Sequence, residues 1–109
     1  MSRAKGNIAE DKAVCYLEEN GYLIVERNFY SRFGEIDIIA AKGDVLHFVE
    51  VKSAQEYEVA IENITKTKLS RFIKTVDVYL KKNALDVAFM IDAVIVVDNE
   101  ISIIENITF

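Results

Sequence analysis

The first apolar residues of the chain recur at the three-to-four spacing of one helix face: Ala9, Ala13, Tyr16 and Leu17. This spacing predicts an amphipathic helix over about residues 6–19. Asn20-Gly21 follows directly. Because glycine tolerates the left-handed conformation that commonly closes a helix, this pair marks the predicted helix end.

The period then changes from that of a helix to that of a strand. Residues 22–29 are rich in aromatic and β-branched types, and residues 35–41 and 45–53 alternate between apolar and polar. Gly34 and the tripeptide Lys42-Gly43-Asp44 separate these segments. Short connections of this kind predict an antiparallel meander of three strands.

A second helix is predicted over about residues 65–82, with Thr65 as its N-cap. Its apolar face consists of Leu69, Phe72, Ile73, Val76, Tyr79 and Leu80. Two further strands, 87–97 and 100–107, are joined by Asp98-Asn99. The first of them contains the continuous apolar run AVIVV, which is typical of a strand covered on both faces.

These elements predict an α/β fold of order αβββαββ, a mixed β-sheet flanked by helices. The helix between the third and fourth strands permits them to pair in parallel. With 109 residues, the chain has the length of one domain. A single domain spanning residues 1–109 is therefore expected.

Composition excludes several classes of protein. There are no prolines, and hydrophobic residues make up 51% of the chain, so a disordered or linker-like chain is not expected. No apolar run approaches the roughly 18 residues of a membrane span, and no signal-peptide core is present, which predicts a cytoplasmic protein. One cysteine, Cys15, and one histidine, His47, exclude a Cys/His metal knuckle. Both residues are expected to have structural roles.

Charge is unevenly distributed. The formal net charge is −5, yet residues 34–58 hold six acids against two lysines, whereas residues 59–83 hold six bases against two acids. An acidic segment therefore precedes a basic one. The acidic total opposes binding to DNA, but local charge decides a binding site.

Two pairs of charged residues share strand faces in the middle of the chain. Glu35 and Asp37 lie two positions apart on one predicted strand, and Glu50 and Lys52 do so on the next. A strand period of two places each pair on one face. A solvent-facing polar edge is the simple interpretation. However, Glu50 and Lys52 lie within an apolar strand, where unpaired charges are costly and are kept for an ion pair or a metal.

The chemistry that needs this set of residues is metal-assisted hydrolysis of a phosphodiester. Asp37 and Glu50 supply the hard oxygen ligands that Mg²⁺ (or Mn²⁺) prefers. The metal activates a water and stabilises charge on the phosphate. Lys52 then neutralises the negative charge that develops during attack.

Two motifs connect these residues to known proteins. Gly34-Glu35-Ile36-Asp37 followed by Phe48-Val49-Glu50-Val51-Lys52 resembles the PD-(D/E)XK signature of restriction-endonuclease-like nucleases. The chain as a whole resembles the YraN-like bacterial family, which is similar to archaeal Holliday-junction resolvases. Further matching positions are Ala9-Glu10, Ala13, Gly21-Tyr22, Arg27-Asn28, Lys68 and Asp92.

The resemblance implies a restriction-endonuclease-like core of αβββαβ order and a divalent-metal-dependent endonuclease. Asp37 and Glu50 match its metal ligands, with the Val51 carbonyl as a third. Lys52 matches the catalytic lysine, and Glu10 matches an additional acid of resolvase-like members. For Glu10 alone, an acid that favours a helix N-terminus is an equal alternative.

The second helix carries the candidate DNA-binding residues, Lys66, Lys68 and Arg71. An ordinary solvated helix face is the alternative for them. Family members usually have arginines at two further positions, which are Ala54 and Met90-Ile91 in this chain. Both departures remove plausible phosphate contacts and weaken the expected affinity for DNA.

Two functions therefore remain open at the level of sequence. One is an Mg²⁺-dependent DNA endonuclease, with structure-selective cleavage as one form. The other is a non-catalytic module that binds nucleic acid or protein and keeps the nuclease fold. The apolar last strand permits a homodimer. The aromatic residues Phe29, Tyr30 and Phe33, although they lie beside arginines, are expected to pack in the core.

Overall fold

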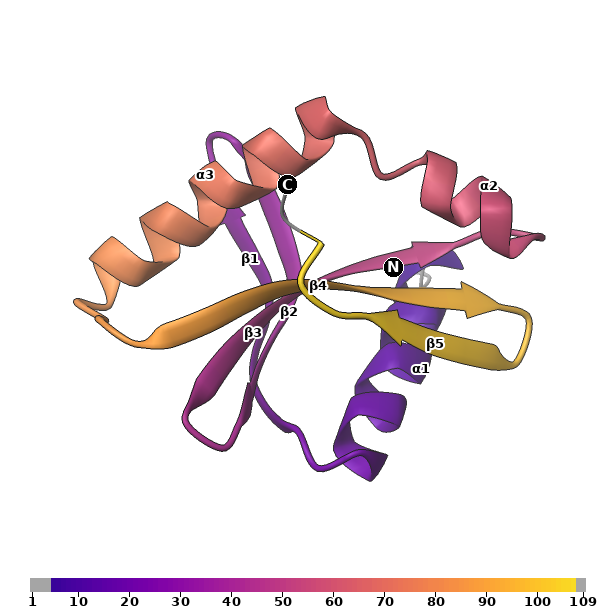
Figure 1. Ribbon diagram of the computed structural model, residues 1–109, viewed down its shortest axis with the longest axis horizontal. Coiled ribbons are helices and arrows are strands. Elements are labelled where there is room, and N and C mark those ends of the chain that lie inside the picture. Colours follow the sequence, from indigo (N-terminus) through magenta and orange to yellow (C-terminus); the bar gives the residue numbers. More distant parts are fainter. Residues whose placement is uncertain (1–4, 108–109) are drawn as a thin grey trace.

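A five-stranded mixed sheet forms the centre of the structure, a computed structural model that describes residues 5–107 (Figure 1). The elements in chain order are α1 (Lys5–Glu19), β1 (Leu23–Ser31), β2 (Gly34–Lys42), β3 (Val45–Ser53), α2 (Tyr57–Glu62), α3 (Lys66–Lys82), β4 (Ala88–Val97) and β5 (Glu100–Ile104). This confirms the predicted mixed sheet flanked by helices.

The strands lie in the order β1-β2-β3-β4-β5. β1, β2 and β3 form the predicted antiparallel meander. β4 pairs in parallel with β3, because the segment between them, which contains α2 and α3, returns the chain to the starting end of β3. β5 then pairs antiparallel with β4 and forms one edge of the sheet.

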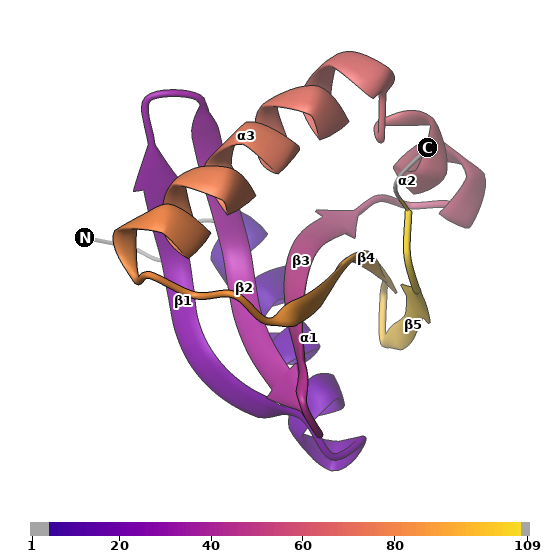
Figure 2. The same cartoon turned by 60° about the vertical axis from the view of Figure 1, so that its left-hand side comes forward.

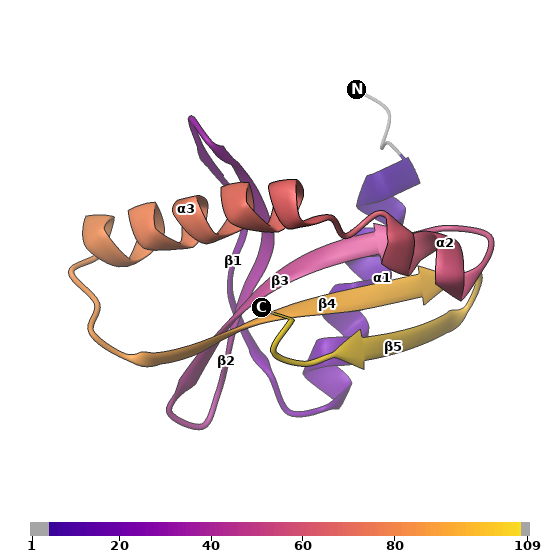
Figure 3. The same cartoon turned by 45° about the horizontal axis from the view of Figure 1, so that its top comes forward.

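Helices cover both faces of the sheet. α1 packs on one face and α3 crosses the other, as the rotated view of Figure 3 shows. Alternate residues of β4 follow this division. Val94 and Val96 pack in the core under α1, Ile91 packs with α3, and Ala93 and Ile95 pack with α2. A strand buried on both faces explains the continuous apolar run in its sequence.

α3 begins as predicted, but its buried face includes one different residue. The Thr65 side chain accepts a hydrogen bond from the Lys68 backbone N–H at 3.2 Å, so Thr65 is the N-cap. Ile73, expected in the core, is 41% exposed, whereas Thr75 is fully buried. Burial of its hydroxyl is tolerated because it donates to the Arg71 carbonyl at 3.1 Å.

Two elements differ from the prediction. The short helix α2 was not predicted, because six residues with no side-chain cap give little periodic signal. The last strand ends at Ile104 rather than at residue 107. Asn106 has a left-handed φ of 54°, and its backbone N–H donates to Asp92 Oδ1 at 2.8 Å, so the chain leaves the ladder there.

The apolar side chains of β5 are partly buried within the molecule. Ile101 and Ile103 pack against the core under α1, and Ile104 packs against the cluster beneath α2. They therefore contribute to the fold, and the homodimer stays a prediction. None of the helices in residues 5–107 has the length and apolar character needed to cross a membrane.

Candidate active site

The sheet divides between β2 and β3. Their ladder runs from Lys42↔Val45 only as far as Ile38↔Val49. Beyond that point, β2 pairs only with β1, and β3 pairs only with β4. The two backbones therefore diverge and leave a fork whose sides are the start of β2 and the end of β3.

The side chain of Asp37 lies in this fork. Its Oδ2 accepts a hydrogen bond from the backbone N–H of Val51 at 2.8 Å. The carboxylate thus takes the place of a backbone carbonyl of β2 where the ladder has ended. Such a contact satisfies a backbone donor that the diverging strands would otherwise leave without a partner.

Four carboxylates and one amine line a single cavity of about 410 Å³ at the fork: Glu10, Glu35, Asp37, Glu50 and Lys52. The expectation that Asp37, Glu50 and Lys52 meet on one side of the sheet agrees with this geometry. The sequence period accounts for it, because the β2–β3 register continued by one residue would place Asp37 opposite Glu50.

Three of the acids approach one another closely. Carboxylate oxygens of Glu10, Glu35 and Asp37 lie within 4.8 Å of one another. With its amide nitrogen facing the acids, Asn28 donates to Glu35 at 2.7 Å and to Glu10 at 3.2 Å. Asn28 has a left-handed φ of 56°, a conformation that asparagine adopts more readily than most residues. Its backbone therefore aims the amide at the acids.

The pKa of Asp37 is raised to about 8. Burial is the largest cause, followed by the negative charge of Glu50; the Val51 N–H opposes the shift, and Glu10 and Glu35 add smaller repulsions. Near neutral pH, Asp37 is consequently protonated in most molecules when no cation is bound. The cavity holds more negative charge than its protein surroundings compensate.

Glu10 enters this cavity from α1 and is almost completely buried. Burial raises its pKa, and Arg27 opposes the rise. The Arg27 guanidinium donates to Asp11 at 2.7 Å and to Glu10 at 3.4 Å. Because α1 begins at Lys5, Glu10 lies beyond the first turn, which disfavours the alternative of an acid stabilised by the helix dipole.

Glu50 and Lys52 form an ion pair of 3.0 Å, and each is about a quarter exposed. A second cavity, of about 240 Å³, opens on the α3 side of Asp37 and Glu50 and is lined by Lys68 and Arg71. Two of the three candidate DNA-binding residues therefore line the same cavity as Asp37 and Glu50. The third, Lys66, is exposed at the first position of α3.

Two residues of this site were missed. Asn28 was noted in the sequence only as a matching position, and Tyr30 was expected in the core but is 68% exposed and lines the cavity with Glu35. Phe29 is buried as expected, and Phe33 is half-buried. The alternation of β1 could have identified both residues, because Asn28 and Tyr30 lie two positions apart and so share one face of that strand.

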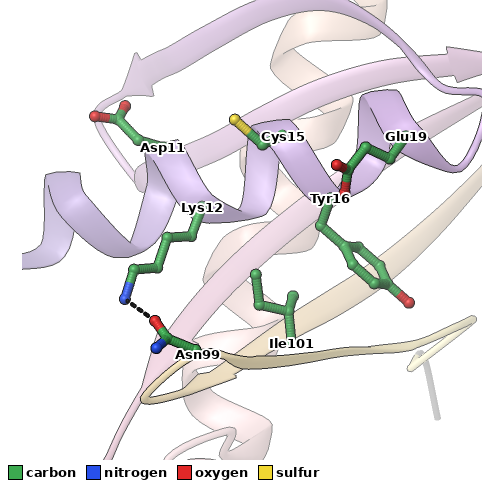
Figure 4. Close-up of a pocket in the computed structure, with 7 residues that line it drawn as sticks. All are labelled: Asp11, Lys12, Cys15, Tyr16, Glu19, Asn99 and Ile101. Atoms are coloured by element: carbon green, nitrogen blue, oxygen red, sulfur yellow. Dashed lines mark hydrogen bonds between the residues drawn. The ribbon is translucent and has the colours of Figure 1, made fainter.

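The remaining two expectations concern Cys15 and His47. Cys15 is exposed rather than packed; it lines a groove between α1 and β5 with Tyr16 and Ile101 (Figure 4). His47 is buried, and its Nδ1 lies 2.6 Å from Asp92 Oδ2. This pair fills a polar position inside the core, as expected of a structural histidine.

The sequence also matches known proteins. The profile of the uncharacterised protein family UPF0102 matches residues 9–96. A UPF0102 protein of Sulfurimonas denitrificans is 68% identical over 108 residues, which cover 99% of each chain. UPF0102 proteins of Wolinella succinogenes and Aliarcobacter butzleri are 55% and 53% identical, again over 99% of each chain. The matched range contains Glu10, Asp37, Glu50 and Lys52.

Proposed function

The chain belongs to the uncharacterised protein family UPF0102, and we propose that it is a divalent-metal-dependent endonuclease that hydrolyses phosphodiester bonds in DNA. The observation that carries this proposal is the position of Asp37 in the fork of the sheet, in one cavity with Glu10, Glu35, Glu50 and Lys52. A cluster of carboxylates with one amine is the set of groups that metal-assisted phosphodiester hydrolysis requires.

The donor atoms fit Mg²⁺ or Mn²⁺. All are carboxylate oxygens, the ligands that these hard cations prefer. The spacing of up to 4.8 Å among the three clustered acids is close to the roughly 4.2 Å between opposite ligands of an octahedral Mg²⁺ ion. The raised pKa of Asp37 supports the same assignment, since a bound cation would offset both the burial and the neighbouring negative charges that keep its proton in place.

Each residue has a separate part in the proposed reaction. Asp37 would hold the cation with Glu10 and Glu35, whose carboxylate oxygens lie within 4.8 Å of its own. Glu50 lies outside this group and pairs with Lys52, so Glu50 and the Val51 carbonyl are ligands only as the resemblance implies. A bound cation lowers the pKa of a water and stabilises charge on the phosphate. Lys52 would donate to a phosphate oxygen or to the attacking water, and Glu50, 3.0 Å from its amine, would orient it.

The substrate proposal rests on α3. Lys68 and Arg71 line the cavity that contains Asp37 and Glu50, so a phosphate held by these cations would lie beside the acids. Lys66 would extend the contact along the backbone of the DNA. Because the net charge of the protein is −5, binding should depend on these few contacts and weaken steeply with salt.

A cleavage assay on duplex, single-stranded, flap and four-way-junction DNA tests this proposal. Wild-type protein with Mg²⁺ or Mn²⁺ should cleave at least one substrate. Asp37→Asn, which keeps the acceptor for Val51 N–H, should cleave none. Asp98→Asn makes the same change at an exposed turn and should cleave as wild type does.

Absence of cleavage by the wild type with either metal on all four substrates would contradict the proposal. If the same protein still bound DNA, the alternative of a non-catalytic binding module would replace it. The thermal stability of the wild type in Mg²⁺ then reports whether the acids bind a metal at all.

A further inference from the structure

Within residues 5–107, four cations around the α3-side cavity have no acidic partner: Arg32, Lys68, Arg71 and Lys74. None of the ion pairs among the described residues includes them. By contrast, Arg27 is paired with Asp11, Lys52 with Glu50 and Lys81 with Asp77. A group of such cations on a protein of net charge −5 raises the local potential where an anion would bind.

Phe33 positions two of these cations. The Arg32 guanidinium carbon lies 4.8 Å from the centre of the Phe33 ring, and the Lys74 amine lies 5.5 Å from it. These distances fall within the range of cation–π attraction. Phe33 also lines the cavity with Asp37 and Glu50. The uncharged ring of Phe33 thus holds Arg32, from the β1–β2 hairpin, and Lys74, from α3, near the acids.

The hairpin that carries Arg32 and Phe33 is attached to the helix. Ser31 and Thr75 share a hydrogen bond of 2.8 Å between their hydroxyls, and Thr75 is fully buried. A Cβ added at Gly34 would lie 3.8 Å from Thr75 Oγ1, which shows how closely the hairpin approaches α3. Figure 2 shows the loop between β1 and β2 beside the helix. The backbone segments that carry Arg32 and Lys74 are therefore held together before any ligand binds.

The two openings of the site differ in charge. Glu35, Asp37 and Glu50 line both cavities. The cavity toward α1 adds Glu10 and Lys52, whereas the cavity toward α3 adds the two cations Lys68 and Arg71. The α3 side therefore offers a phosphate more positive charge than the α1 side does. We propose that the hairpin–helix wall, formed by Arg32, Phe33, Lys68, Arg71 and Lys74, is a phosphate-binding subsite that holds the nucleic-acid backbone beside the acidic cluster.

This inference rests on the proposed nuclease function for its ligand, but it is tested by binding alone. The probe is a short fluorescein-labelled single-stranded DNA, titrated without metal at several salt concentrations. Replacing both Arg32 and Lys74 by alanine should weaken binding and reduce the slope of log affinity against log salt by about 1.4, that is, about 0.7 for each phosphate that is no longer neutralised. The double variant Lys81→Ala/Lys82→Ala removes the same charge at the far end of α3 and should keep the wild-type slope.

Phe33 offers a test in which charge does not change. Phe33→Ala should weaken binding about two- to fivefold, the loss expected when a cation–π contact no longer positions its cation. Phe33→Tyr keeps the ring and should restore wild-type affinity. Circular dichroism of each variant separates this effect from unfolding.

Two outcomes would overturn the subsite. One is an equal loss of DNA affinity in the Arg32/Lys74 and Lys81/Lys82 variants. The overall charge of the protein, and not the position of these cations, would then determine binding. The other is wild-type affinity in both the Arg32/Lys74 variant and Phe33→Ala. A wild-type protein that binds as described but cleaves no substrate would refute the nuclease proposal and leave the subsite in place.

Discussion

The backbone N–H of Val51 donates to Asp37 Oδ2 across 2.8 Å, at the place where β2 and β3 separate. One side chain therefore completes the hydrogen bonding of the sheet and also occupies the centre of the acidic cluster. Its ionisation consequently affects both the stability of the fold and the binding of a cation.

Asp37→Asn should stabilise the protein without metal, and the gain should depend on pH. The folded-state pKa of Asp37, about 8, lies above its ordinary value of 3.8. Between these values the unfolded chain binds fewer protons than the folded one, so the wild-type free energy of unfolding falls as pH rises. Asp37→Asn has no ionisable group at this position. Its free energy of unfolding should therefore exceed that of the wild type by a few kcal/mol near pH 8, and the difference should vanish near pH 4.

Chemical denaturation of both proteins across this pH range provides the measurement, with Asp98→Asn as the control. A difference that does not change with pH would show that Asp37 acts through hydrogen bonding alone and does not titrate in this range.

Binding of Mg²⁺ or Mn²⁺ should release a proton. Because Asp37 is protonated below about pH 8, the cation must displace that proton to gain the ligand. Affinity should therefore rise about tenfold for each pH unit up to about pH 8 and then level off. Calorimetric titration in buffers of different ionisation enthalpy measures the released protons directly. Zero release at neutral pH would mean that Asp37 is not a ligand or is already ionised.

Lys52→Ala should separate catalysis from stability. Loss of the partly exposed ion pair with Glu50 should lower the free energy of unfolding by only ~1 kcal/mol. Cleavage should fall by about 10²–10³, as expected when a group that stabilises developing charge is removed. Lys81→Ala breaks the exposed pair with Asp77 and should leave cleavage unchanged. Equal cleavage by Lys52→Ala and wild type would exclude a catalytic role for this amine.

Arg27→Met should destabilise the protein more at neutral pH than in acid. Glu10 is almost completely buried and would lose its cationic partner, at a cost on the order of 2 kcal/mol. Protonation of Glu10 removes that cost, so the two proteins should converge as pH falls. Asp11→Asn keeps the contact between Arg27 and Glu10 and should cost less than about 1 kcal/mol. Thermal denaturation at two pH values decides between these outcomes.

The period of the strands predicted much of the site. Alternation placed Asp37, Glu50 and Lys52 on one face, and the spacing of short turns implied the meander that brings the strands together. The division of the sheet left no signal in the alternation, because a strand that changes partners keeps the same period. Sequence alone therefore could not show that Asp37 binds the Val51 N–H.

The burial of three helix residues also differed from what the helical pattern predicted. Cys15 and Ile73 are apolar residues on amphipathic helices, yet both lie at the exposed margin of their helix face. Thr75 is buried instead, since its hydroxyl finds partners in Ser31 and the Arg71 carbonyl. Such partners are distant in sequence or depend on rotamers, and helical periodicity does not report them.

The contact between Val51 and Asp37 also provides a natural spectroscopic probe. The amide proton of Val51 is held by a carboxylate rather than by a neighbouring strand, so its chemical shift should follow the charge on Asp37. A titration of isotope-labelled protein would then display proton loss and cation binding at one backbone resonance, without a dye or a substituted residue. The amide of Val49, within the regular ladder, is the internal reference that should remain still.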